Sequence, residues 1–100
     1  MTTVYKYPCY GRCKIALPIG ARIVRVGLSD GMPCFWAVVN ILADQAHQEL
    51  IACNPSDVKY EEREFQTIST GGLLVGNYWE YVGSWEKNDL VYHIFELIKS

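Results

Sequence analysis

A pair of glycines beside a cluster of aromatic residues is the stretch of the sequence best suited to binding a ligand. Thr70, Gly71 and Gly72 interrupt an extended segment. Glycine permits close approach to the backbone, and N–H groups that converge on one point can hold a phosphate, with the Thr70 hydroxyl as a further donor. The stretch has neither a Walker lysine nor the Rossmann glycine spacing. Taken alone, it is better explained as a turn that contains a positive-φ glycine.

Two arginines are candidates to neutralise the charge of an anionic ligand. Arginine offers a planar fork suited to phosphate or carboxylate. Arg25 interrupts an otherwise apolar segment, and Arg63 precedes the glycine pair in the chain. We expect most of the other basic side chains to be solvated or paired with nearby glutamates.

Aromatic side chains crowd the segment that follows the glycines. Tyr78, Trp79 and Tyr81 would occupy both faces of one strand, so a core on one side cannot cover them all. Exposed tyrosine and tryptophan stack on bases and also dominate protein interfaces. Tyr78 and Trp79 are therefore candidates for stacking on a base. An aromatic-rich core together with a dimer contact explains the same residues equally well.

The sequence carries no catalytic signature. A nucleophilic triad needs a base, and His47 and His93 are the two histidines. No Gly-x-Ser-x-Gly motif is present, and no cysteine lies in a recognisable catalytic context. We expect His93 to be hydrogen-bonded within a strand, and we predict a protein that is not an enzyme and has no catalytic residues.

The four cysteines predict neither a metal site nor a disulfide framework. The N-terminal stretch lacks a basic region followed by a long apolar run, so we expect no signal peptide and a cytosolic protein with free thiols. The spacing between Cys9 and Cys13 is loose for structural zinc. Cys34 lies in an apolar run and should behave as a small hydrophobe. We expect no metal and no cofactor.

Length and charge restrict the class of protein further. One hundred residues, half of them apolar, predict one domain over residues 1–100. A net charge of −2 argues against a nucleic-acid polymer as the partner, since such proteins usually carry a basic excess. No apolar run approaches the ~20 residues that span a bilayer, so we expect no membrane partner.

The elements that would position these residues are mostly strands. Short apolar alternations separated by Gly, Pro, Asp and Asn predict extended segments and two hairpins, with turns at 29–31 and 86–89. The expected strands are Thr3–Tyr7, Lys14–Leu17, Ala21–Leu28, Pro33–Ile41, Glu62–Ser69, Tyr78–Trp85 and Leu90–Ile98. The strand Pro33–Ile41 is apolar on both faces and is therefore expected at the centre of its sheet.

The segment Ala43–Cys53 has a different composition. Its Ala, Gln, Glu and Leu residues are helix formers, and its apolar positions fall on one stripe. We predict a mostly β fold: a curved antiparallel sheet or small barrel of about six strands, with this one short helix inserted.

Ordered fragments along the chain carry a resemblance to a known family. They are Tyr5-Lys6-Tyr7-Pro8, Leu17-Pro18, Gly20-Ala21, Gly31-x-Pro33, Trp36-Ala37, Arg63-x-Phe65, Thr70-Gly71, Tyr81-Val82-Gly83 and Val91-Tyr92-His93-Ile94-Phe95-Glu96. In this order they resemble a family of small uncharacterised phage and prophage proteins. The resemblance covers nearly the whole chain except residues 42–60, where it implies that the predicted helix is an insertion. It implies a phage-encoded accessory protein, and the family has no established activity.

Two functions follow as expectations. The first is a counter-defence protein of the host cytoplasm that sequesters a small anionic, nucleotide-like molecule without catalysis. Its site would comprise Thr70, Gly71, Gly72, Arg25, Arg63, Tyr78 and Trp79. The second is an inhibitor or assembly factor that binds a host protein through exposed aromatics. For either function we expect a homo-oligomer, since a subunit interface is a natural place for a pocket.

Overall fold

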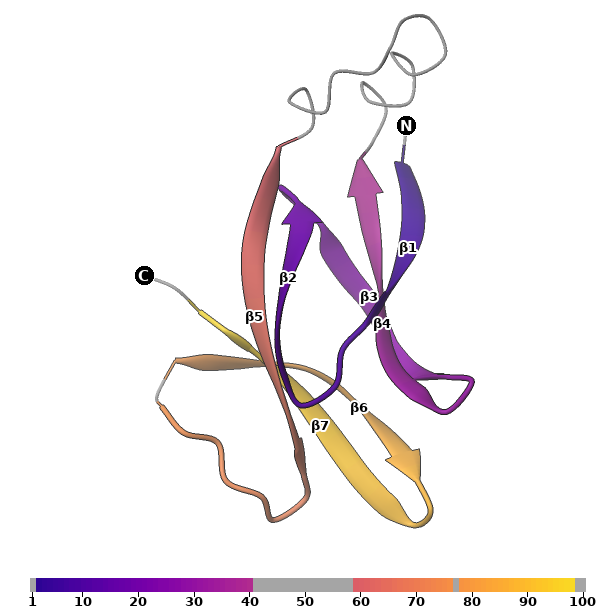
Figure 1. Ribbon diagram of the computed structural model, residues 1–100, viewed down its shortest axis with the longest axis vertical. Helices are drawn as coiled ribbons and strands as arrows, with labels where there is room; N and C mark the ends of the chain where they lie inside the picture. The colour runs from indigo at the N-terminus through magenta and orange to yellow at the C-terminus, as the bar shows by residue number, and fades with distance from the viewer. Residues whose placement is uncertain (1, 41–58, 77, 99–100) are drawn as a thin grey trace, which may run out of the picture.

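The computed structural model describes residues 2–40, 59–76 and 78–98, and every regular element in these ranges is a β-strand. Two antiparallel sheets result (Figure 1): a three-stranded sheet in the order β1-β4-β3 and a four-stranded sheet in the order β2-β5-β7-β6. The strands are β1 (Thr2–Pro8), β2 (Arg12–Pro18), β3 (Arg22–Ser29), β4 (Met32–Asn40), β5 (Tyr60–Ser69), β6 (Trp79–Lys87) and β7 (Leu90–Leu97).

The prediction of a mostly β fold is confirmed, and the prediction of one curved sheet or barrel is wrong. Each expected strand is present, with slightly different ends. The strands form two sheets and not one, because the chain passes from the first sheet at the end of β1 into the second sheet at β2. At the opposite side, β3 and β6 contact each other but do not pair in a ladder. The predicted helix 43–53 lies outside the described residues, and so do His47 and Cys53.

The core lies between the two sheets. Phe35, Ala37 and Val39 form the fully buried face of β4, which is central in its sheet as predicted. The ring of Phe35 lies 4.9 Å from that of Phe65 on β5, centroid to centroid, and 5.4 Å from that of Tyr7 on β1. The contact between Phe35 and Phe65 joins the two sheets, because each sheet contributes one of these buried phenylalanines.

Close contact between β3 and β6 depends on a glycine. A Cβ built at Gly83 would lie 2.8 Å from the Val26 Cγ2 atom, closer than packed atoms tolerate. Each strand has an irregularity nearby: the register of β3 shifts between Ile23 and Arg25, and that of β6 between Tyr81 and Gly83. The absent side chain at position 83 lets the edges of the two sheets meet.

Both predicted hairpins are confirmed. Asp30 and Gly31 have φ values of 51° and 78° between β3 and β4, and Asn88 and Asp89 have φ values of 52° and 64° between β6 and β7. Two successive positive φ angles are typical of the type I′ turn, whose twist matches that of paired strands. The β1–β2 turn lies toward the same end of the molecule as these two tips (Figure 1).

The expectation of free thiols is wrong for two cysteines. Cys9 and Cys13 form a disulfide, with 6.3 Å between their Cα atoms. The bond forms because the β1–β2 turn brings the end of β1 back onto β2, a proximity that sequence spacing does not show. Cys34 is buried with a free thiol, in line with its expected apolar role.

In the three ranges that the structure describes, no helix has the length and apolar character needed to cross a membrane.

Candidate functional site

The glycine pair forms a compact turn whose donors are largely used within the fold. The Gly72 N–H donates to the Ser69 carbonyl at 2.8 Å, and Gly71 has a φ of 90°. The Thr70 N–H donates to the Val91 carbonyl at 2.9 Å. Two of the three expected phosphate donors are therefore already hydrogen-bonded.

The Thr70 side chain closes this turn onto β7. Its hydroxyl donates to the Val91 carbonyl at 3.2 Å, and its oxygen lies 2.8 Å from the Nε2 atom of His93. When the hydroxyl proton points to Val91, Nε2 donates to the threonine oxygen. His93 is thus hydrogen-bonded to Thr70, as expected.

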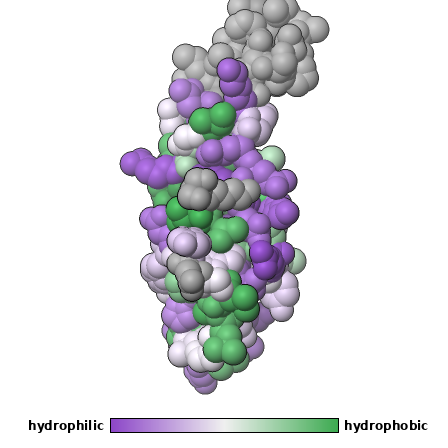
Figure 2. All heavy atoms as spheres, turned by 90° about the vertical axis from the view of Figure 1, so that its left-hand side faces the viewer, coloured by the Kyte–Doolittle hydropathy of each residue, from purple (hydrophilic) through white to green (hydrophobic). Residues whose placement is uncertain are grey.

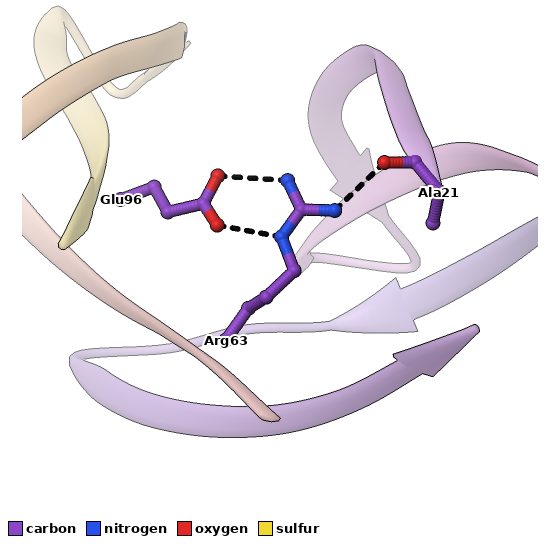
Figure 3. Close-up of polar contacts among 3 residues, drawn as sticks. All are labelled: Ala21, Arg63 and Glu96. Atoms are coloured by element: carbon purple, nitrogen blue, oxygen red, sulfur yellow. Dashed lines mark hydrogen bonds and ion pairs between the residues drawn. The ribbon is translucent and has the colours of Figure 1, made fainter. Parts of the chain in front are cut away.

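Arg63 is held in a two-point ion pair and is not free to bind an anion. Its Nε lies 2.5 Å from Oε2 of Glu96 and its Nη2 lies 2.8 Å from Oε1, while its Nη1 donates to the Ala21 carbonyl at 2.7 Å (Figure 3). The hydrogen bond to Glu96 raises the pKa of Arg63 above its usual value, against an opposing effect of burial. Five donors in a fixed fork suit this arrangement, which ties the four-stranded sheet to the start of β3.

Two hollows lie beside this ion pair, and the first of them is acidic. Both are lined by Ala21, Arg63 and Glu96. Glu61 and Glu62 line the first hollow, of about 380 Å³, whereas Glu80 and Arg22 line the second, of about 310 Å³. Because Glu96 already neutralises Arg63, the first hollow keeps a negative charge that repels an anion, whereas Arg22 offsets Glu80 in the second.

The other predicted site residues lie apart. The guanidinium of Arg25 lies 5.1 Å from the ring centroid of Trp36 in the three-stranded sheet. Tyr78 is exposed, and the Trp79 Nε1–H donates to the Val75 carbonyl at 2.8 Å.

The turn and the tryptophan lie near opposite ends of β7, because Ser69 pairs with Tyr92 and Trp79 with Leu97. At 3.3 Å per residue, that is roughly 16 Å along the strand. The structure does not bring the seven predicted residues together.

A different pocket, which we call the tip pocket, lies where the three turns approach one another. Its volume is about 290 Å³, at the lower limit of small-molecule sites. The hairpin β6–β7 provides one wall, and β3, β4 and the β1–β2 turn provide the rest. The lining residues are Tyr10, Leu28, Gly31, Pro33, Trp85, Lys87, Asn88, Leu90 and Tyr92.

Aromatic rings dominate this pocket. Trp85 and Tyr92 pair directly across β6 and β7, and their rings stack with centroids 5.7 Å apart and planes 13° apart. Trp85 is buried, so its ring is fixed by the core. Tyr10 projects from the β1–β2 turn and is 75% exposed, which leaves the faces of its ring open to a ligand.

The charge of the tip pocket is opposite to that of the first hollow at Arg63. Among the described residues that line it, Lys87 is the one charged side chain. Asp30 and Asp89 occupy the adjoining turns without lining the pocket. The pocket therefore places aromatic rings and one cation side by side.

Sequence analysis missed the tip pocket because its residues are far apart in the chain. The two hairpin turns at 29–31 and 86–89 were predicted, but nothing local shows that they converge with the β1–β2 turn. A usable signal exists in the residues beside them: Tyr10 stands next to one turn, and Trp85 and Tyr92 flank another.

Within the described ranges, no group of three His, Cys, Asp or Glu side chains is arranged to hold a metal ion. A comparison of the chain with protein-family models, curated proteins and solved structures finds no match.

Proposed function

We propose that this protein is a non-catalytic binding protein, and that the tip pocket holds a small molecule combining a flat ring with a negative charge, as in a nucleotide. One observation carries the proposal: the pocket has aromatic walls and a lysine, and no carboxylate lines it among the described residues. An aromatic surface is worth about 1–3 kcal/mol for each base that stacks on it.

Each side chain has a separate role in this proposal. The ring of the ligand lies against Tyr10, whose exposed faces give it the freedom to stack. Trp85 and Tyr92, held against each other, form a rigid wall that does not need to be ordered on binding. Lys87 faces the anionic group, and the Asn88 amide provides hydrogen bonds.

The expected biological role is sequestration. A phage accessory protein that lowers the free concentration of a nucleotide signal in the host cytoplasm needs a pocket and no chemical step. The resemblance to small phage proteins supports this context, and the sequence offers no nucleophile–base pair that would argue for turnover.

A titration against a small panel tests this function. AMP, 3′,5′-cyclic AMP and ADP-ribose are added to the protein at millimolar concentration, and binding is followed by calorimetry. Adenosine, which lacks the phosphate, and ribose 5-phosphate, which lacks the base, are the matched controls. We expect at least one nucleotide to bind with a dissociation constant of about 1 mM or tighter, and more tightly than either control. No heat from any nucleotide would refute the proposal.

A second function is favoured by a separate surface, an apolar patch beside the start of β6. Leu73, Val75 and Tyr78 are 89%, 81% and 70% exposed, and Tyr81 is 55% exposed. The segment between β5 and β6 lies on the side seen in Figure 2, where hydrophobic groups gather in the lower part of the view. Exposed apolar groups of this kind are typical of protein-binding surfaces.

The two functions are separated by a capture experiment. Under the second function, a host protein or a further copy of this chain covers Leu73, Val75 and Tyr78. The double variant Leu73→Ser/Val75→Ser should then lose a stoichiometric partner that the native protein retains. If the partner stays bound to this variant, the apolar patch is not the contact.

A further inference from the structure

The disulfide and the tip pocket share one short loop. Cys9 and Cys13 close a ring around three residues, Tyr10, Gly11 and Arg12. The first of these, Tyr10, lines the tip pocket and is mostly exposed. The exposed aromatic residue of the pocket is therefore held by a covalent constraint that thiols can remove.

Without the disulfide, the loop around Tyr10 is held by backbone hydrogen bonds on either side and by the ion pair between Arg12 and the buried Glu64. The Cys9 N–H donates to the Pro33 carbonyl at 2.9 Å, and the Gly11 carbonyl accepts from the Thr67 N–H at 2.9 Å. These bonds keep the turn in place, but Gly11 has a φ of 65°, and a glycine meets little steric resistance to other backbone conformations. Reduction should thus loosen the loop while the sheets remain paired.

We propose that thiol–disulfide exchange at Cys9 and Cys13 regulates the tip pocket, so that the oxidised protein binds its ligand more tightly than the reduced protein. This inference rests on the proposed function. A ring fixed before binding loses less conformational entropy when a ligand stacks on it. The immobilisation of one side chain corresponds to roughly a two- to tenfold difference in affinity.

The exchange begins at Cys13. Cys9 is 2% exposed, whereas Cys13 is only partly buried, so an external thiolate has access to the Cys13 sulfur. Its attack forms a mixed disulfide with Cys13 and releases the Cys9 thiolate, which takes up a proton. A second thiol of the reductant then attacks the mixed disulfide and leaves Cys13 as a thiol. The Cys9–Cys13 disulfide gains two electrons, and the two reductant thiols become one disulfide.

The test compares the affinity for AMP in the oxidised protein and after reduction with dithiothreitol. Alkylation and mass spectrometry report the state of Cys9 and Cys13 in each sample. We expect AMP to bind roughly two- to tenfold more weakly to the reduced protein. Equal affinity in the two states would overturn this inference alone, whereas no binding of AMP, 3′,5′-cyclic AMP or ADP-ribose in either state would overturn the proposed function as well.

Two variants and one ligand-free measurement complete the test. Tyr10→Ala keeps the disulfide and should bind AMP with the same affinity before and after reduction. The double variant Cys9→Ala/Cys13→Ala should match the reduced protein and not respond to dithiothreitol. If this variant does not fold, backbone NMR relaxation of the native protein, measured before and after reduction, provides the test. The Tyr10 and Gly11 amides should become more mobile on reduction, and unchanged mobility would contradict the proposal.

Discussion

Trp85 and Tyr92 face each other across β6 and β7 with their rings stacked 5.7 Å apart. Such a pair is worth about 0.5–1.5 kcal/mol beyond the area it buries, and it fixes both rings in one position. Because the same two rings line the tip pocket, the core of the four-stranded sheet continues into the wall of the binding site. The pocket is therefore preformed on that side.

The charge at the rim should control the affinity for an anion. Asp89 has a φ of 64°, a conformation that asparagine also adopts readily, so Asp89→Asn removes a charge without straining the turn. We expect Asp89→Asn to strengthen AMP binding and Lys87→Gln to weaken it, each by roughly two- to fivefold near the protein surface. Calorimetric titration at low and high salt measures the affinity of both variants for AMP. Their differences from the native protein should be smaller at high salt. An increase in affinity with Lys87→Gln would refute the role of this lysine.

The contact between the sheets should depend on Gly83. In Gly83→Ala the new methyl group meets Val26, and we expect a loss of about 1–3 kcal/mol in the free energy of unfolding. Gly27→Ala is the matched control, because a Cβ there has its nearest neighbour at an ordinary 3.8 Å. The double variant Gly83→Ala/Val26→Ala should regain part of the loss. Urea denaturation of the three variants tests the prediction, and a fully stable Gly83→Ala would contradict the close approach of β3 to β6.

The ion pair of Arg63 should contribute to stability and not to binding. Both side chains are 17% exposed, so Glu96→Gln leaves a largely buried positive charge without its partner. We expect a loss of up to about 3 kcal/mol in the free energy of unfolding, which is the lower end of the range for removing one partner of a buried ion pair. Glu62→Gln, at an exposed position in a neighbouring strand, should change stability little. At a temperature where the Glu96→Gln variant is folded, its affinity for AMP should equal that of the native protein. A large decrease in affinity would indicate that Arg63 takes part in binding.

Alkaline pH should destabilise the protein through Tyr7. Burial, followed by the nearby phenols of Tyr60 and Tyr5, raises the pKa of Tyr7 above its usual 10.0. The unfolded chain therefore releases this proton at a lower pH than the folded protein does. The stabilisation is complete below about pH 10 and is lost as the pH rises through the pKa of Tyr7 in the folded protein.

Tyr7→Phe isolates this effect, because it keeps the ring that stacks on Phe35. Its free energy of unfolding should fall less between pH 9 and pH 11 than that of the native protein. Urea denaturation at several pH values provides the comparison. Parallel curves for the two proteins would show that Tyr7 is not responsible.

The strands and turns were predictable because their signals are local. The alternation of β7 and the Asp30-Gly31 turn are visible within a few residues. The way the two sheets meet was not predictable, since it depends on Gly83 lying against Val26, more than fifty positions away. A glycine in a strand is equally consistent with a bulge, a bend or a close contact.

The predicted site failed to assemble for a similar reason. Arg63 has the fork that an anion needs, but Glu96, thirty-three positions later in the chain, occupies it. The backbone donors of Thr70 and Gly72 are likewise used by Val91 and Ser69. The sequence identifies groups whose chemistry suits an anion. Whether those groups are free to bind a ligand depends on residues that contact them only in the folded protein.

The measurement that tests the tip pocket most directly compares AMP binding by Tyr10→Ala and Tyr78→Ala. The two tyrosines are similarly exposed, at 75% and 70%, so neither change should affect stability much. Tyr10 lines the tip pocket, and Tyr78 belongs to the site expected from sequence. Loss of one stacking surface should weaken binding roughly fivefold or more in Tyr10→Ala and leave Tyr78→Ala unchanged. Normal binding by Tyr10→Ala, with loss in Tyr78→Ala, would contradict the assignment of the tip pocket.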